Sequence, residues 1–385
     1  MTLPNLLTKQ GLAEEYRCYF PITERYVYLN HASVSPLSSS ARDSMTELLE
    51  GVVHHGARKA EEWDRMQSAA RGAAARLVNA EARQIAFLRN TSESLSIVAN
   101  GLDWKSGDNI VSTAVEFPAN VYPWARVAAE KEIELRLEPE MDGRIDVEHM
   151  LTLIDERTRV VTVSWVQYAS GQKLDIRRIG QFCREREILF VVDAVQGLGA
   201  FELDVQRDCV AVFASSAHKF LLGPKGISLL YLSDWALERV HPTVIGWTAV
   251  ENYRDYLTHD LSLRDGAVRF EGGTLNEFGI CGLGAAIELL LRAGPQKVEQ
   301  HLLALTDHLV ERLNERGYRV ASPRRAGDSS AIIVCCHPEF SADKVCGELD
   351  ARNIITSARL GRLRIAPHFY NTLADADALI DALPA

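Results

Sequence analysis

The feature that most constrains this chain is the stretch 188–231, in which two apolar runs each end abruptly in polar residues. The first run, 188–192, ends at Asp193, and the second run, 210–214, is followed within a few residues by Lys219. Short apolar runs of this kind are typical of strands that are buried on both faces of a parallel sheet. Because open α/β sheets bind ligands at the carboxyl ends of their strands, we expect Asp193 and Lys219 to lie at one sheet edge.

A carboxylate and an amine at one sheet edge suit a cofactor that has a basic ring nitrogen and an aldehyde, which describes pyridoxal phosphate. Asp193 would keep the ring nitrogen protonated, because a nearby opposite charge favours the charged form. The protonated ring is the electron sink that stabilises a carbanion at the substrate Cα. Lys219 would join the aldehyde as a Schiff base and later move a proton at Cα. The plainer alternatives are a helix-capping aspartate and a solvated surface lysine.

The segments VVDAVQ and SSAHKFLLGPKGISLLY resemble aminotransferase class V, a family of fold-type I pyridoxal-phosphate enzymes. Cysteine desulfurases, selenocysteine lyases, isopenicillin N epimerases and kynureninases share this pattern. The resemblance extends from Tyr28 to about Thr372, and several separate motifs occur in the family's order. It implies an α/β fold with a large, mainly parallel-sheet domain and a small carboxyl-terminal α+β domain.

Strands that alternate with helical segments favour the same architecture. We predict an amino-terminal arm over residues 1–27, a large cofactor-binding domain over 28–260 and a small domain over 261–385. After Tyr318 the expected order changes to strand, helix, strand, helix, which is typical of an α+β domain. The segment 265–280 is predicted to lie at an interface.

The resemblance assigns cofactor contacts to residues near the ends of the predicted strands. Thr91 and Ser92 stand where a strand meets a helix, and hydroxyls with free backbone N–H groups at a helix start suit a phosphate. Helix capping explains these two residues equally well. The other implied contacts are Phe117 stacked on the ring, Gln167 and Gln196 near its phenolic oxygen, Ser216 and His218 beside the phosphate and ring, and Thr274, which would reach the phosphate of a partner chain. Desulfurases carry a histidine at the position of Phe117, and a phenyl ring cannot transfer protons.

Three residues are candidates for substrate binding. Arg364, in LRIAPHFYNT, matches the family arginine that binds the substrate α-carboxylate through two hydrogen bonds. His31 and Trp247 are candidates for substrate selectivity, although a surface histidine and a packed tryptophan are the plainer interpretations. The position of Thr274 implies that two chains build each site, so we expect a homodimer.

The absence of a cysteine from one segment influences which reaction we expect. Desulfurases of this family carry a nucleophilic cysteine shortly before the carboxylate-binding arginine, whereas residues 351–364 contain none, and Cys346 lies within an apparent helix. We therefore expect a lyase, an epimerase or an aminotransferase that acts on an amino acid through a Cα carbanion, and not a persulfide-forming cysteine desulfurase. The alternatives are a non-catalytic pyridoxal-phosphate-binding homologue, which would have lost Lys219, Asp193 or Arg364, and an NAD-dependent oxidoreductase, which would need a glycine fingerprint.

Composition excludes several other classes. The net charge is −10 and no basic stripe occurs, so we expect no nucleic-acid partner. No signal peptide or membrane-length apolar run is apparent, which favours a cytoplasmic protein without a membrane partner. The seven cysteines are scattered and odd in number, which favours reduced thiols. No metal site is expected, because the histidines are scattered and no HExxH or CxxC occurs.

Overall fold

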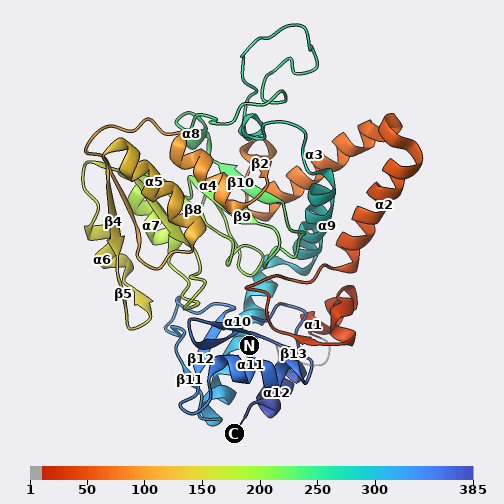
Figure 1. Cartoon of the computed structure of the whole chain (residues 1–385), viewed down its shortest axis with the longest axis vertical. Coiled ribbons are helices and arrows are strands. Elements are labelled where there is room, and N and C mark those ends of the chain that lie inside the picture. The colour runs from red at the N-terminus through yellow and green to blue at the C-terminus, as the bar shows by residue number, and fades with distance from the viewer. Residues whose placement is uncertain (1–10, 385) are drawn as a thin grey trace.

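The computed structural model describes residues 11–384, and its largest element is a seven-stranded sheet (Figure 1). The order across the sheet is β2, β10, β9, β8, β7, β3, β4. The strands are β2 (Ile85–Leu88), β3 (Asn109–Thr113), β4 (Glu134–Glu138), β7 (Thr158–Ser164), β8 (Leu189–Asp193), β9 (Val212–Ser216) and β10 (Ser228–Leu232). β10 is antiparallel to both neighbours and the other pairs are parallel, which confirms the expected mainly parallel sheet.

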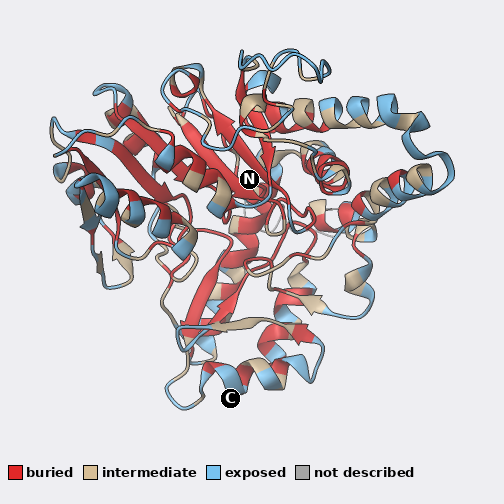
Figure 2. Cartoon of the chain, turned by 45° about the horizontal axis from the view of Figure 1, so that its top comes forward, coloured by how far each residue is buried: buried red, intermediate tan, exposed pale blue. Residues whose placement is uncertain are grey.

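Both faces of this sheet are buried under helices (Figure 2). One face carries α4 (Thr91–Asn100), α5 (Tyr122–Lys131) and α8 (Asp234–Leu237), and the other carries α3 (Ala60–Leu77), α7 (Ile176–Arg184) and α9 (Glu277–Ala293). The side chains of β8 alternate between the two cores, with Val191 on the α4 side and Val192 on the α7 side. A strand covered on both faces needs apolar residues at every position, which explains the continuous apolar run before Asp193.

A second, antiparallel sheet of four strands forms the carboxyl-terminal region, in the order β11, β12, β15, β14. Its strands are β11 (Arg319–Val320), β12 (Ile333–Cys336), β14 (Ser357–Arg359) and β15 (Arg362–Ile365). Its core is shared with α10 (Pro295–Glu315), α11 (Ala342–Asp350) and α12 (Leu373–Ala382). The expected small α+β region is therefore confirmed.

The amino-terminal residues link the two sheets. α1 (Leu12–Tyr16) precedes β1 (Val27–Tyr28), which pairs in parallel with β13 (Ile354–Ile355) beside the small sheet. α2 (Ser39–His55) and α3 then project from the molecule as an arm against which α9 packs (Figure 1). The predicted boundaries at residues 27 and 260 stay predictions, and the part of the expected arm before residue 11 lies outside the described residues.

The remaining elements are short: α6 (Val147–Thr152), the hairpin β5 (Glu140–Met141) and β6 (Arg144–Ile145), and the 3-10 helices η2 (Arg17–Tyr19), η3 (Pro21–Glu24), η4 (Gly56–Lys59), η5 (Ala82–Gln84), η6 (Pro118–Asn120) and η7 (Ala267–Phe270). β4 was not predicted, because this edge strand reads ELRLE and is half exposed, so charged residues mask its apolar signal. Among residues 11–384 no single helix is long and apolar enough to cross a membrane; α9 and α10 meet that test only together, with a bend of 77° between them.

Candidate active site

A cavity of about 470 Å³ lies at the carboxyl ends of β8 and β9, between the large sheet and β15. Its lining consists of Ala32, Ser33, Val34, Asn90, Thr91, Ser92, Phe117, Ala119, Ser164, Val166, Tyr168, Asp193, Val195, Gln196, Ser216, His218, Lys219, Arg359 and Arg364. The structure thus brings together the predicted residues Thr91, Ser92, Phe117, Asp193, Gln196, Ser216, His218, Lys219 and Arg364. Segments far apart in the sequence meet here because parallel strands end at a common edge.

Asp193 and Lys219 share this cavity because β8 and β9 are adjacent and parallel, with Asp193 opposite Ala214. The Asp193 side chain is buried and accepts a hydrogen bond of 3.0 Å from the backbone N–H of Val195. Burial raises the pKa of Asp193, and the nearby Glu116 adds to this effect, while the Val195 N–H and Lys219 oppose it. A cation placed against Asp193 would restore its charged form.

Burial lowers the pKa of the Lys219 amine, Arg364 and Arg359 lower it further, and Asp193 opposes the shift. A lowered pKa leaves more of the amine unprotonated at neutral pH, which is the form that attacks an aldehyde. The Nζ atom of Lys219 lies 5.4 Å from the centroid of the Phe117 ring. Phe117 is 42% exposed, lines the cavity and makes an edge-to-face contact with Tyr168, with ring centroids 5.2 Å apart.

The start of α4 and the end of β9 are joined by their hydroxyl groups. The Oγ1 of Thr91 and the Oγ of Ser216 lie 2.8 Å apart, and each also accepts the backbone N–H of the other residue. Asn90 caps α4 by accepting the N–H of Glu93 at 2.9 Å. Burial, Lys219 and Lys225 lower the pKa of His218 to about 4, so its imidazole is neutral at pH 7. Thr91, Ser216 and His218 are thus neutral donors beside a helix start, which suits an anion.

Arg364 is a buried cation whose hydrogen-bond partners within residues 11–384 are all neutral. Its side chain is 2% exposed, and its guanidinium donates to the carbonyl oxygen of Tyr168 at 3.1 Å and to the Oγ of Ser33 at 2.7 Å. Within the part of the chain that the structure describes, no carboxylate forms an ion pair with it. Burial lowers its pKa to about 10, with a further contribution from Arg359. Because an unpaired buried charge is costly, this position favours an anionic ligand.

The sequence analysis missed Glu116, a buried carboxylate beneath the cavity. It accepts hydrogen bonds from Thr113 at 2.9 Å, from Asn120 at 3.0 Å and from the Nε2 of Gln167 at 2.9 Å. Gln167 itself does not line the cavity, and its Oε1 is buried without a partner among the described residues. An acidic residue three positions after the strand that ends at Thr113 was the available signal.

The sequence analysis also missed Arg359, which lines the mouth of the cavity. It stands opposite Arg362 in the β14–β15 hairpin, and Ser357 stands opposite Arg364. Because strand side chains alternate between faces, Arg359 and Arg364 lie on the same face of this hairpin. The available signal was the presence of three arginines, at 359, 362 and 364, on both sides of the glycine in SARLGRLR.

Three other predicted residues do not line this cavity. His31 is fully buried, and its ring nitrogens contact the carbonyl oxygen of Ala366 at 2.8 Å and the hydroxyl of Tyr370 at 2.6 Å. The expected substrate contact of His31 is thus corrected, because both ring nitrogens are used inside the fold. Trp247 and Thr274 line a separate cavity of about 510 Å³, so within one chain they do not reach Lys219.

The residues of the first cavity fit pyridoxal phosphate. Its lining holds Lys219, Arg359 and Arg364 but only one carboxylate, Asp193, so a phosphate dianion would balance the excess positive charge. The Oε1 of Gln196 is buried without a partner among the described residues. Asp193 would hold the protonated ring nitrogen, Phe117 would cover the ring, and Thr91, Ser92, Ser216 and His218 would hold the phosphate.

Comparisons with known proteins agree with this geometry. Residues 27–372 match the family model described as aminotransferase class-V. A probable cysteine desulfurase of Methanothermobacter thermautotrophicus is 32% identical over 77% of this chain and 74% of that protein. A probable cysteine desulfurase of Pyrococcus abyssi is 29% identical over 97% of both chains. The solved apo structure of cysteine desulfurase from Thermococcus onnurineus superposes with a TM-score of 0.88, at 26% identity over 96% of both chains.

These matches contradict one expectation from the sequence. We expected a reaction other than persulfide-forming cysteine desulfuration, yet several relatives and solved structures with similarity along most of the chain carry the name cysteine desulfurase. The exclusion rested on one short segment, 351–364, that lacks a cysteine. One missing residue type in a hairpin is weaker than similarity over whole chains, so the exclusion is withdrawn.

Proposed function

Given that this chain belongs to the aminotransferase class-V family of pyridoxal-phosphate-dependent enzymes, we propose that it is a cysteine desulfurase. An amino-acid substrate is supported mainly by the buried guanidinium of Arg364, which has no counter-ion among residues 11–384 and shares a cavity with Lys219. The names of the relatives support cysteine as the amino acid.

Each residue of the cavity has a defined task in this proposal. When bound, pyridoxal phosphate supplies the electron sink for a carbanion at the substrate Cα. Arg364 binds the α-carboxylate through its planar pair of N–H donors and fixes the orientation of the Cα–H bond. Lys219 removes and returns the proton at Cα, and Asp193 holds the proton on the ring nitrogen. Phe117 shields one ring face from water.

The sulfur atom needs an acceptor. The Cβ–S bond of cysteine breaks, the sulfur passes to a thiolate to give a persulfide, and protons complete the alanine product. No cysteine is among the described residues that line the cavity. The accepting thiol therefore reaches the cavity from elsewhere in the chain, from a partner copy or from solution.

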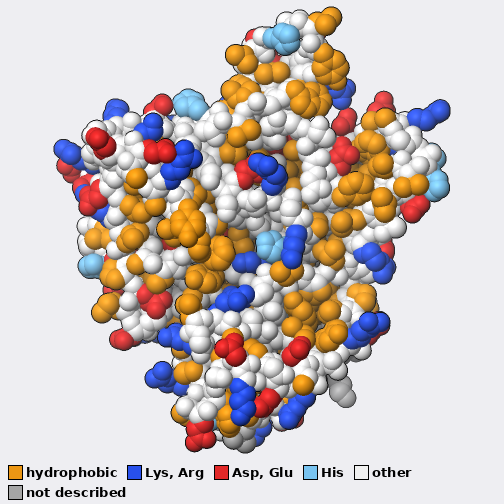
Figure 3. Space-filling model, in the orientation of Figure 1, with side chains coloured by type: hydrophobic (Ala, Val, Ile, Leu, Met, Phe, Trp, Pro, Cys, Tyr) orange, Lys and Arg blue, Asp and Glu red, His pale blue; other side chains and the backbone are white. Residues whose placement is uncertain are grey.

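Two copies of the chain form a homodimer in this proposal. The segment 244–261 projects from the molecule, and apolar side chains gather on this projection (Figure 3). Within it, Trp247 is 49% and Leu257 is 90% exposed. Trp247 and Thr274 line the second cavity beside this segment. A second copy seated here would bury these side chains, as a symmetric interface requires. Sedimentation equilibrium should give a dimer, and a stable monomer would remove this part of the proposal.

A location in the cytoplasm is also part of the proposal. All seven cysteines have free thiols in the structure, which is usual in a reducing compartment.

The reaction is tested by incubating the cofactor-loaded enzyme with L-cysteine and dithiothreitol and measuring alanine, sulfide, pyruvate and ammonia. Desulfuration gives alanine and sulfide in equal amounts. Pyruvate and ammonia in place of alanine would show β-elimination and overturn the proposal. The Lys219→Ala variant is the control, because it keeps the cavity but lacks the amine.

A further inference from the structure

The backbone around Lys219 is hydrogen-bonded by two residues that are distant in the sequence, Ser35 and His368. Ser35 donates its N–H to the carbonyl oxygen of His218 at 2.8 Å and its hydroxyl to the carbonyl oxygen of Lys219 at 2.7 Å. The Nε2 of His368 lies 2.9 Å from the carbonyl oxygen of Phe220. Three successive carbonyl groups around the lysine are thus hydrogen-bonded by residues that are remote in the sequence.

The contacts of His368 fix its tautomer. Its Nδ1 accepts the backbone N–H of Phe369 at 2.8 Å, so Nδ1 carries no proton in the neutral ring. The proton must then lie on Nε2, which makes that atom the donor to the Phe220 carbonyl. Burial is the main cause that lowers the pKa of His368, to about 4, so the ring is neutral at pH 7.

The carbonyl that His368 binds has no room to move. Gly199 approaches it from another side so closely that a Cβ atom on Gly199 would lie 2.1 Å from the Phe220 oxygen. Gly199 also has a φ of 96°, which other residues rarely adopt. The Phe220–Leu221 peptide, one residue beyond Lys219, therefore lies between Gly199 and His368.

His368 also lies on the segment that supplies Arg364. It follows Arg364 by four residues, directly after β15, whereas Lys219 belongs to the loop after β9. The hydrogen bond from His368 to Phe220 therefore connects the arginine-bearing strand to the lysine-bearing loop.

We propose that His368 is a positioning residue that fixes the Lys219 amine relative to Arg364 by donating a hydrogen bond to the Phe220 carbonyl. This inference rests on the proposed role of Lys219 as the cofactor lysine and not on which product is formed. His368 could act on the loop through its hydrogen bond or only through the packing of its ring. A substitution that removes the N–H donor and keeps a similar side-chain volume separates these two roles.

Two variants of His368 isolate the donor. His368→Gln can place an amide N–H near the position of Nε2, while His368→Asn can place an amide oxygen near the position of Nδ1 and cannot reach Phe220. The readouts are the pH midpoint of the visible absorption band of the cofactor-loaded enzyme without substrate, and kcat and KM with L-cysteine. We expect His368→Asn to move the midpoint and lower kcat about 10- to 100-fold with KM within about threefold, because small misplacements of a reacting group are costly. We expect His368→Gln to retain the wild-type midpoint and most of kcat.

A buried hydrogen-bonding side chain at the opposite edge of the sheet is the control. Asn109 is buried and donates to the Oδ1 of Asp155 at 2.7 Å, at the start of β3, whereas the lysine loop lies at the carboxyl ends of the strands. Asn109→Ala should lower the melting temperature without moving the midpoint. If Asn109→Ala moves the midpoint as far as His368→Asn, or if the Gln and Asn variants of His368 behave alike, the positioning role is overturned.

Ser35 provides a second test that does not depend on His368 variants folding. Ser35→Ala removes the hydroxyl donor to the Lys219 carbonyl, and Ser35→Thr keeps it. We expect the Ala variant alone to shift the absorption midpoint in the direction of His368→Asn, and an unmoved midpoint would count against the inference. A wild-type enzyme without any visible band would instead refute the proposed role of Lys219.

Discussion

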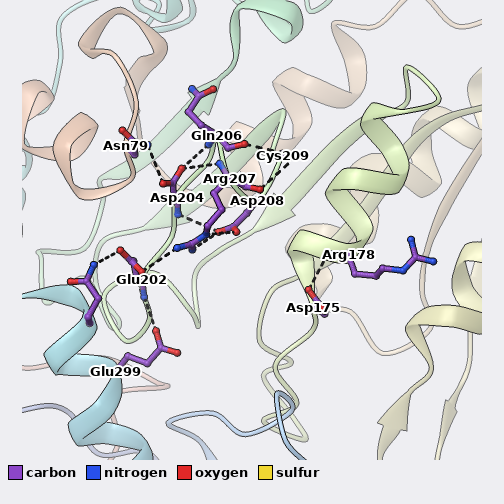
Figure 4. A network of polar contacts seen from close by, with 11 residues as sticks. Asn79, Asp175, Arg178, Glu202, Asp204, Gln206, Arg207, Asp208, Cys209 and Glu299 are labelled. Carbon is purple, nitrogen blue, oxygen red and sulfur yellow. Dashed lines mark hydrogen bonds and ion pairs between the residues drawn. The ribbon is translucent and has the colours of Figure 1, made fainter.

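The cavity around Lys219 and a polar network beside α10 hold similar numbers of charged side chains. The two regions differ in whether the central arginine contacts carboxylates. In the network, which consists of Glu202, Asp204, Arg207 and Asp208, Arg207 pairs with two of the carboxylates, and Asp204 accepts three hydrogen bonds, from two backbone N–H groups and from the amide of Asn79 (Figure 4). Arg207 forms two hydrogen bonds with Asp208, at 2.8 and 2.9 Å, and one with Glu202 at 3.2 Å. In the cavity, the partners of Arg364 among the described residues are all neutral.

The difference separates charges that maintain the fold from charges that await a ligand. Burying an ion costs several kcal/mol unless a partner and hydrogen bonds compensate, so a chain retains an uncompensated cation only where binding offsets the cost. The pKa directions agree: Asp208 and Glu202 raise the pKa of Arg207, whereas burial lowers that of Arg364. Removing a charge from the cavity should therefore impair function, and removing one from the network should impair stability.

The largest effect is expected from Lys219→Ala. Turnover of L-cysteine should fall by at least about 10²–10⁴-fold, the usual contribution of a positioned acid–base group. The melting temperature of the cofactor-free protein should not fall, because within residues 11–384 the amine forms no ion pair that would stabilise the fold. Lys173→Met is the control: Lys173 pairs with Glu299 at 3.5 Å outside the cavity, so turnover should stay unchanged. Retained turnover in Lys219→Ala would erase the contrast between the two regions.

Arg364→Gln should have the next largest effect. Loss of a charged hydrogen bond to the substrate carboxylate should weaken cysteine binding by about 1.5–3 kcal/mol, measured as a rise in KM or in the dissociation constant of an unreactive amino acid. The cofactor-free variant should be at least as stable as the wild type, since a buried unpaired cation is removed. A clear loss of stability with unchanged affinity would show that Arg364 maintains the fold and does not bind substrate.

How far the sequence could reveal these regions depends on the range of the interactions involved. Asp193 and Lys219 could be placed at one sheet edge because each follows an apolar run, and burial of a parallel sheet on both faces is a local pattern. Arg359 could not be placed at the cavity from the sequence, because its position depends on the register of a hairpin. His31 was misplaced because its burial depends on Tyr370, which lies 339 residues away.

The expected reaction failed for a related reason. The absence of a cysteine from residues 351–364 describes one hairpin, whereas the thiol that accepts sulfur can come from any segment or molecule that reaches the cavity. The network was not predicted at all, because in the sequence Glu202, Asp204, Arg207 and Asp208 resemble an ordinary polar loop, and their contacts arise only in the folded chain.

The two regions should respond to pH with opposite signs in the cofactor-free protein. Burial raises the pKa of Asp193, so between about pH 4 and that raised pKa the folded state binds a proton that the unfolded state does not, and stability falls as pH rises. Burial alone would also raise the pKa of Asp204, but the N–H groups of Arg207 and Gln206 and the amide of Asn79 lower it overall. The contribution of ionised Asp204 to the stability of the folded state is present above about pH 4 and is lost as pH falls through the lowered pKa.

Melting temperatures from pH 3 to pH 8 for Asp193→Asn, Asp204→Asn and the wild type test this contrast. Asp193→Asn should flatten the decline above about pH 4, where one proton contributes at most about 1.4 kcal/mol per pH unit. Asp204→Asn should flatten only the acid limb. Identical profiles for all three proteins would mean that neither carboxylate is perturbed.

The smallest effect is expected from Arg207→Gln, which removes the central cation of the network. The Arg207 side chain is 38% exposed and Asp208 only 6%, so water compensates much of the lost ion pair but not all of it. We expect the free energy of unfolding in urea to fall by about 1 kcal/mol, near the upper end for exposed pairs, with kcat and KM unchanged. The double variant Arg207→Gln with Asp208→Asn should recover part of this loss, because no unpaired carboxylate remains. A fall in turnover without a fall in stability would show that this network can serve the reaction, and the distinction between the two regions would not hold.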